Sequence, residues 1–212
     1  MEFSGYSKQL IENLLQIKAI QLNPQNPFTW ASGWNSPVYC DNRKILSFPE
    51  VRNYVKQGLL NIAKQDFSGY NCIAGVATAG IPWGAIMADI LGLPFVYVRN
   101  KPKGHGMKNT IEGVLPENPI VLVVEDVIST GMSSLQAVED LREQGAEICG
   151  MVAIYTYGFP EAIEKFKHAN VHLKTLTTYE VLVNVCLEKG FIGEDMLETL
   201  TLWRQNPGDW QK

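Results

Sequence analysis

Two acidic residues at the end of an apolar run are the side chains of this sequence best suited to chemistry. Glu125 and Asp126 follow the apolar run Val121–Val124 and precede a short polar turn, Val127–Ser133. Main-chain N–H groups of such a turn, and the positive end of a helix that opens after it, favour a monophosphate. Gly131 permits a close backbone approach, the turn's hydroxyls add donors, and the two carboxylates can accept hydrogen bonds from neighbouring sugar hydroxyls. The string predicts a ribose-phosphate site.

Two other catalytic interpretations of this acidic turn fail on geometry or on sequence. The paired acids of a glycosidase flank a bond at about 5–9 Å, whereas consecutive strand residues point to opposite faces. A P-loop needs a lysine after its glycine, and the chain contains no G-x-x-x-x-G-K-[ST] string. An acidic strand end with an ordinary helix cap is the structural alternative. We favour the ligand site because the whole string fits it.

A basic segment, Arg99–Lys108, follows another predicted strand. It carries four fixed cations and His105 but no acid, so its charges repel one another unless an anion arrives. Gly104 and Gly106 make the segment mobile enough to close as a lid over a diphosphate and exclude water. A solvated basic loop is the plainer alternative. Its expected position beside the acidic turn favours the lid.

Two weaker signals leave function and packing equally open. The small-residue turn Gly75–Pro82 could lie against a diphosphate or allow close packing of a strand on a helix. Four aromatic side chains could form a stacking face for a flat base or belong to the core. They are Phe28, Trp30, Trp34 and Tyr39.

The elements that must position these residues read as strands alternating with helices from residue 72 onward. This pattern predicts an α/β fold with a mostly parallel sheet flanked by helices. Its strand-to-helix loops then gather at the carboxyl edge of the sheet, where open α/β sheets bind ligands. The expected strands are Cys72–Ala77, Phe95–Val98, Ile120–Asp126 and Ile148–Tyr155, with a weaker one near Val171–Leu176.

The N-terminal part does not follow this alternation. Apolar residues from Leu10 to Ile17 recur at helical spacing, and Phe28–Lys44 is typical of an irregular or hairpin segment. Ser47–Glu50 has the spacing of a capping box before a second helix that carries Val51–Ile62. We expect this region to form a small lobe over the carboxyl edge of the sheet.

Composition narrows the class of protein. The 212 residues are 46% hydrophobic, enough for one substantial core, so we expect a single domain. A net charge of −4 provides no cationic field for nucleic acid or an anionic membrane. The four cysteines are scattered, and we expect His168 and His172 to be separated by the start of a strand, so no protein metal site is predicted. Without a signal peptide or a long apolar run, a cytoplasmic location is expected.

The acidic turn resembles the phosphoribosyl-diphosphate signature of type I phosphoribosyltransferases. Together with the Arg99–Gly106 loop and the string Phe28-Thr29-x-x-Ser32-Gly33-x-x-Ser36-Pro37, the resemblance narrows to orotate phosphoribosyltransferases. It implies the type I fold with a small N-terminal hood lobe (about 1–48), a core (about 49–180) and a C-terminal helical tail (about 181–212). It also implies Mg²⁺-dependent transfer to orotate in pyrimidine nucleotide synthesis, by a homodimer whose lids act in trans.

The resemblance also assigns roles to residues. Arg99, Lys103 and His105 would contact diphosphate, and Ser129 would reach orotate as well as the sugar phosphate. Lys103 and Asp126 would be the catalytic residues, with Mg²⁺ held mainly by substrate oxygens. The residues expected to hold the ribose and its 5′-phosphate are Glu125, Asp126, Val127, Ile128, Ser129, Thr130, Gly131, Met132 and Ser133.

The sequence departs from the family pattern at three places. Ala31 and Asn100 stand where many members carry lysine, and Tyr155–Tyr157 lacks an arginine that some members use for orotate. Those three contacts are left unassigned. Two alternatives stay open: transfer to another base, such as a purine, and a regulator that senses phosphoribosyl diphosphate without turnover, although no helix-turn-helix appendage is visible.

Overall fold

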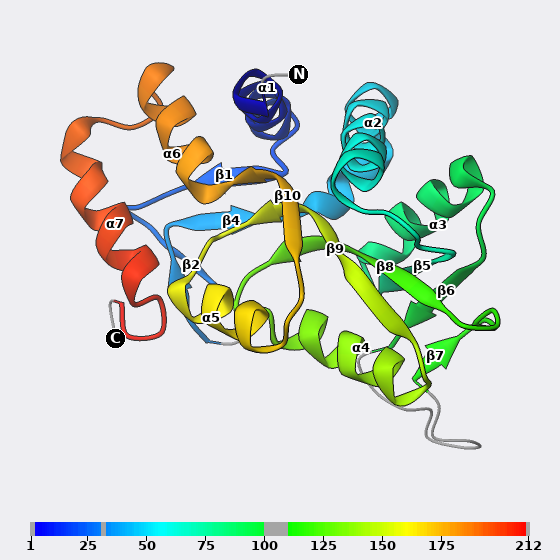
Figure 1. Cartoon of the computed structure of the whole chain (residues 1–212). Coiled ribbons are helices and arrows are strands. Elements are labelled where there is room, and N and C mark those ends of the chain that lie inside the picture. Colours follow the sequence, from blue (N-terminus) through cyan, green and yellow to red (C-terminus); the bar gives the residue numbers. More distant parts are fainter. Residues whose placement is uncertain (1–2, 31–32, 100–109, 211–212) are drawn as a thin grey trace.

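A six-stranded sheet forms the centre of the computed structural model, which describes residues 3–30, 33–99 and 110–210 (Figure 1). Its strand order is β10-β9-β8-β5-β6-β7, and every neighbouring pair is parallel except β6 and β7. The strands are β5 (Cys72–Val76), β6 (Phe95–Val98), β7 (Ile111–Glu112), β8 (Ile120–Ile128), β9 (Glu147–Thr156) and β10 (Leu173–Thr178). The predicted mostly parallel α/β sheet is confirmed.

Helices cover both faces of this sheet, which explains why its central strands β5 and β8 are mainly apolar runs. Figure 1 shows α1 (Phe3–Gln16), α2 (Pro49–Asp66) and α3 (Gly80–Leu91) on one side, and α4 (Met132–Glu143) and α5 (Pro160–His168) on the other. Two C-terminal helices follow, α6 (Tyr179–Glu188) and α7 (Leu197–Gln205), joined by the short 3₁₀ helix η2 (Glu194–Met196). None of the helices in the described ranges has the length and apolar character of a membrane span.

The predicted strands are in the right places, but some of their end residues differ from the observed ones. β8 continues two residues past Asp126, because Val127 and Ile128 still pair with Tyr155 and Thr156 of β9. The capping-box prediction at Ser47 was wrong. Ser47 ends the 3₁₀ helix η1 (Asn42–Ser47), Phe48 precedes α2 without a side-chain cap, and Pro49 starts the helix. Proline suits that first position because its fixed φ matches the helix.

The order in which the chain adds strands reverses between β5 and β8, so β6 and β8 lie on opposite sides of β5. From β5 the chain passes through α3 to β6 on one side, whereas β8 pairs with the opposite side of β5 and leads on to β9. Ligands of open α/β sheets bind beside such a switch point, at the carboxyl ends of the strands. The loops after β5 and β8 therefore lie where ligands usually bind in folds of this kind.

Glycines let α3 approach this switch point. A Cβ atom on Gly80 would lie 2.5 Å from the Val124 carbonyl oxygen, and one on Gly84 would lie 2.7 Å from the Phe95 ring. Contacts this short have no room for a side chain. The structure thus supports the packing explanation of the small residues that begin α3.

Residues 20–47, here called the short-strand segment, form two small antiparallel pairs. β1 (Ile20–Leu22) pairs with β4 (Val38–Cys40), and β2 (Phe28–Thr29) pairs with β3 (Asn35–Ser36). Helix α1 instead packs against β10, α2 and α6 on one face of the central sheet. The hairpin prediction is confirmed, while the predicted boundaries of hood, core and tail stay predictions.

The C-terminal segment packs on the short-strand segment of its own chain. Trp203 of α7 is fully buried, and its indole N–H donates to the Asn35 carbonyl oxygen at 3.1 Å. Trp30 joins this aromatic cluster and packs with Trp34, so the core alternative holds for Trp30. The rings around Trp203 are those of Trp30, Tyr157, Phe159 and Tyr179.

Trp203→Ala should lower the free energy of unfolding by ~3–5 kcal/mol, because it removes a fully buried indole and leaves a cavity. Urea denaturation of the two proteins measures this difference. Leu202→Ala is the matched control, since Leu202 is 54% exposed and should cost far less. Equal losses for the two variants would contradict the packing described.

Candidate active site

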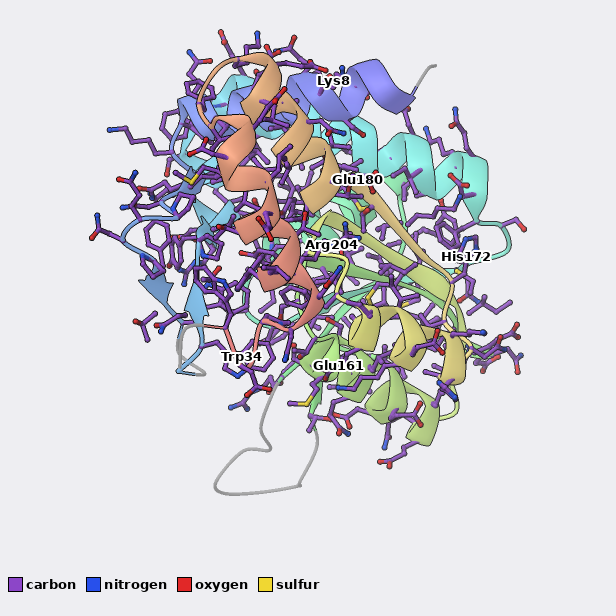
Figure 2. All side chains as sticks on the ribbon, turned by 90° about the vertical axis from the view of Figure 1, so that its left-hand side faces the viewer. Lys8, Trp34, Glu161, His172, Glu180 and Arg204 are labelled. Atoms are coloured by element: carbon purple, nitrogen blue, oxygen red, sulfur yellow. The ribbon has the colours of Figure 1, made fainter. Side chains whose placement is uncertain are left out.

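Three distant segments of the chain line one cavity of about 360 Å³ at the switch point. The turn after β5, the end of β8 with its following turn, and the short-strand segment each contribute. The lining residues are Cys40, Asp41, Arg43, Ala77, Thr78, Ala79, Glu125, Asp126, Val127, Ser129 and Ser133. A larger cavity of about 560 Å³ between α5, α6 and α7, whose lining includes Glu180 and Arg204 (Figure 2), contains none of the predicted site residues. The smaller cavity is therefore the candidate active site.

The acid pair is almost completely enclosed, with Glu125 5% and Asp126 8% exposed. The two Glu125 carboxylate oxygens are both bound by the protein. Oε1 accepts from the Asp126 main-chain N–H at 2.9 Å, and Oε2 accepts from the Ser134 hydroxyl at 3.0 Å. Since Ser134 belongs to the first turn of α4, Glu125 ties the end of β8 to the start of that helix.

Burial changes the acidity of both groups. Loss of water raises the pKa of Glu125 well above its usual value, and the neighbouring Asp126 charge raises it further. Burial also raises the pKa of Asp126, against the opposing effect of nearby hydrogen-bond donors and Arg43. Holding two ionised carboxylates here costs free energy, which donors or positive charge from a ligand would offset. The pair therefore suits a ligand that brings hydroxyl groups.

The turn after β8 has the geometry of an anion site. Gly131 adopts the left-handed conformation (φ 75°), and a Cβ there would lie 2.8 Å from the Phe166 ring. No side chain caps the N-terminus of α4, so its first N–H groups face the turn as donors for an anion. Ser129 and Ser133 line the cavity beside them. The predicted monophosphate cradle thus has the required elements together.

The turn after β5 serves two purposes. Ala77, Thr78 and Ala79 line the cavity, and the Ala77 N–H donates to the Val98 carbonyl oxygen at 2.8 Å, which fixes the start of the turn to β6. The peptide bond between Ala77 and Thr78 is cis. Small residues here leave the main chain open to a ligand, while the glycines before and after them allow close packing.

The short-strand segment adds residues that the sequence reasoning missed. Asn42 is fully buried, its amide donates to the Asp126 carbonyl oxygen at 2.9 Å, and it accepts from the Cys40 thiol at 3.3 Å. Beside it, the Arg43 Nε donates to the Asp41 carboxylate at 2.6 Å and lowers the pKa of Asp41. The available signal was an Asp-Asn-Arg triplet directly after an apolar strand. Asn42 fastens the segment to the acid pair.

The basic segment is only partly visible. Lys103 and His105 lie outside the described residues, as do Ala31 and Asn100. Arg99 is described, and its guanidinium pairs with Glu112 at 3.3 Å. It does not line the candidate active site, but it shares an adjoining hollow with Met132 and Ser133.

The remaining predicted residues have mixed environments. Ile128 is buried in the core, so only its main chain can face a ligand, while Thr130 and Met132 do not line the cavity. Tyr155, near the end of β9, and Tyr157, directly after that strand, are buried aromatic residues. In the described parts of the chain, no three His, Cys, Asp or Glu side chains gather in a way that would hold a metal ion.

Comparisons with known proteins agree with this geometry. Residues 48–184 match the family model described as a phosphoribosyl transferase domain. Proteins named orotate phosphoribosyltransferase match over most of the chain: that of Cytophaga hutchinsonii is 53% identical, covering 98% of this chain and 100% of its own. That of Bacteroides thetaiotaomicron is 57% identical and covers 94% of each.

A solved structure gives the same answer for the fold. The crystal structure of orotate phosphoribosyltransferase from Aeropyrum pernix superposes with a TM-score of 0.75 at 31% identity, covering 87% of this chain and 99% of that one. The chain therefore belongs to the orotate phosphoribosyltransferase family.

Proposed function

We propose that this protein transfers the phosphoribosyl group of 5-phosphoribosyl 1-diphosphate to orotate, releasing diphosphate and orotidine 5′-phosphate, in the synthesis of pyrimidine nucleotides. The observation that carries the proposal is the enclosed acid pair beside an uncapped helix N-terminus at the switch point of the sheet. Relatives at 50–57% identity that are named for this activity support the choice of base. A cytoplasmic location stays a prediction.

The geometry suggests how the sugar is oriented. The turn Ser129–Ser133 binds the 5′-phosphate, and the acid pair accepts hydrogen bonds from the two ribose hydroxyls. With both ends of the sugar held, its anomeric carbon faces the open part of the cavity. Orotate N1 then forms the new C–N bond as the C–O bond to diphosphate breaks and the leaving group takes the electron pair. Positioning supplies much of the rate enhancement, because orotate N1 can lose its proton readily and needs no strong protein base.

Mg²⁺ is part of this proposal, and the donors of the cavity suit it. Mg²⁺ prefers oxygen ligands and usually combines one or two carboxylates with substrate oxygens. Asp126 provides a carboxylate at the cavity. When bound, the ion would neutralise charge on the departing diphosphate.

The basic segment is proposed as the lid, with Lys103 as its main cation. The described residues on either side of positions 100–109 are paired, because the Arg99 N–H donates to the Thr110 carbonyl oxygen at 2.8 Å. A segment that leaves the sheet and returns to it at neighbouring residues can close over a bound substrate without disturbing the sheet. The family resemblance suggests that each lid serves the partner subunit of a homodimer.

An assay of diphosphate release tests the proposed function. With 5-phosphoribosyl 1-diphosphate and Mg²⁺, orotate should give turnover, whereas uracil, adenine and guanine should stay near background. A chelator should abolish release, and added Mg²⁺ should restore it. Faster release with another base would overturn the choice of orotate, and tight substrate binding without release from any base would favour a sensor.

Lys103→Ala should lower kcat by ~10²–10³-fold, the usual loss when one preorganised electrostatic contact to the transition state is removed. Lys64→Ala, at an exposed position on α2, serves as the control and should leave kcat unchanged. Steady-state kinetics of both variants measures the effect. Unchanged turnover for Lys103→Ala would reject the lid.

Asp126→Asn should weaken binding of 5-phosphoribosyl 1-diphosphate by about 10–100-fold, the range expected for lost charge-assisted hydrogen bonds. Titration calorimetry gives the affinity, and circular dichroism should show an unchanged fold. Asp89→Asn, at an exposed position on α3, is the control. If Asp126→Asn binds 5-phosphoribosyl 1-diphosphate with wild-type affinity, the proposed role of the acid pair in binding it is contradicted.

Mixing the two variants tests action in trans. If lids serve partner subunits, a mixed dimer of Lys103→Ala and Asp126→Asn holds one intact site. After random exchange, equal amounts should recover roughly a quarter of wild-type activity, since half of the dimers are mixed. No recovery would assign each lid to its own subunit.

A further inference from the structure

The charges around the candidate active site are unbalanced. Among the described residues that line it, three are carboxylates, Asp41, Glu125 and Asp126, and one, Arg43, is a cation. A second anionic substrate entering beside these acids would be repelled unless a positive charge faces it. Arg43 is the described group that can provide this charge.

Arg43 is held in a defined orientation by its neighbour. Its Nε donates to Asp41 Oδ1 at 2.6 Å, and the Asp41 side chain is 16% exposed while that of Arg43 is 63% exposed. Within the described part of the chain Arg43 donates no other hydrogen bond, so its two terminal nitrogens are available to a ligand. Asp41 thus fixes one edge of the guanidinium and leaves the other as a fork of donors.

The other parts of the cavity already have partners for the sugar substrate. The turn at the start of α4 suits the 5′-phosphate, Glu125 and Asp126 suit the ribose hydroxyls, and the Ala77–Ala79 turn suits the diphosphate. What remains is the side formed by the short-strand segment, which brings Cys40, Asp41 and Arg43. The base must lie on this side.

We propose that Arg43, oriented by Asp41, binds the carboxylate of the pyrimidine substrate and thereby selects a carboxylated base over an uncharged one. A planar guanidinium matches a carboxylate with two parallel hydrogen bonds, which adds geometric specificity to the attraction. This inference rests on the proposed function, since it requires orotate as the second substrate. Asp41 acts as a positioning residue and does not touch the base.

Arg43→Met tests the proposal, because methionine keeps an unbranched side chain and removes the charge. The KM for orotate should rise about 10–100-fold, the loss expected for a charged hydrogen bond, while the KM for 5-phosphoribosyl 1-diphosphate stays within about threefold. The preference for orotate over uracil, as the ratio of kcat/KM values, should fall by the same factor. Since Arg43 is mostly exposed, the melting temperature should stay near that of the wild type.

Three further variants sharpen the result. Arg43→Lys should recover only part of the preference, since lysine keeps the charge but not the fork. Asp41→Asn should raise the KM for orotate less than Arg43→Met does, because Arg43 is present but less firmly oriented. Lys44→Met is the control, because Lys44 is the adjacent cation and does not line the cavity; its KM for orotate should match the wild type.

The outcomes separate this inference from the proposed function. If the wild-type protein turns over orotate but Arg43→Met has an unchanged KM for orotate, the proposed role of Arg43 is overturned while the proposed function stands. A rise confined to the KM for 5-phosphoribosyl 1-diphosphate would also overturn it and assign Arg43 to the diphosphate. A wild-type protein without orotate turnover would overturn the proposed function, and the inference with it.

Discussion

The burial of two adjacent carboxylates at the end of β8 is the constraint on which the site depends. Polar groups removed from water here need donors from the protein, and two of these donors come from different parts of the chain. Ser134 binds Glu125 from α4, while Asn42 binds the Asp126 main chain from the short-strand segment. These contacts therefore bring the turn before α4 and the short-strand segment together at the acid pair.

The sheet supplies the rigid frame for this arrangement. β5 and β8 are neighbours, so the turn after one faces the turn after the other across the switch point. Gly75, Gly80 and Gly84 allow α3 to lie directly against these strands. Because the α3 backbone is fixed in this way, the Ala77–Ala79 turn has a defined position relative to the acid pair. Precision at the cavity thus derives from close packing beneath it.

Charge is distributed locally rather than over the molecule. The chain carries a net charge of −4, yet both proposed substrates are anions. In the proposed mechanism, attraction therefore comes from a few local groups: the N-terminus of α4, the cations of the basic segment and Arg43. A site built this way gains selectivity, because each fixed donor set matches one anionic group of one substrate.

By itself, the sequence determined the elements whose signals are local. The apolar runs predicted β5, β6, β8, β9 and β10, and the string ending at Ser133 predicted a turn before a helix with Gly131 in it, because strand formation and left-handed backbone preference depend on neighbouring residues. The tertiary structure decided what depends on partners far along the chain. Asn42 meets Asp126 across 84 residues, Trp203 meets Asn35 across 168, and β8 extends to Ile128 because β9 lies beside it. Hydrophobic periodicity specifies which face of an element is buried but not what it is buried against, so these contacts emerge only when the chain is folded.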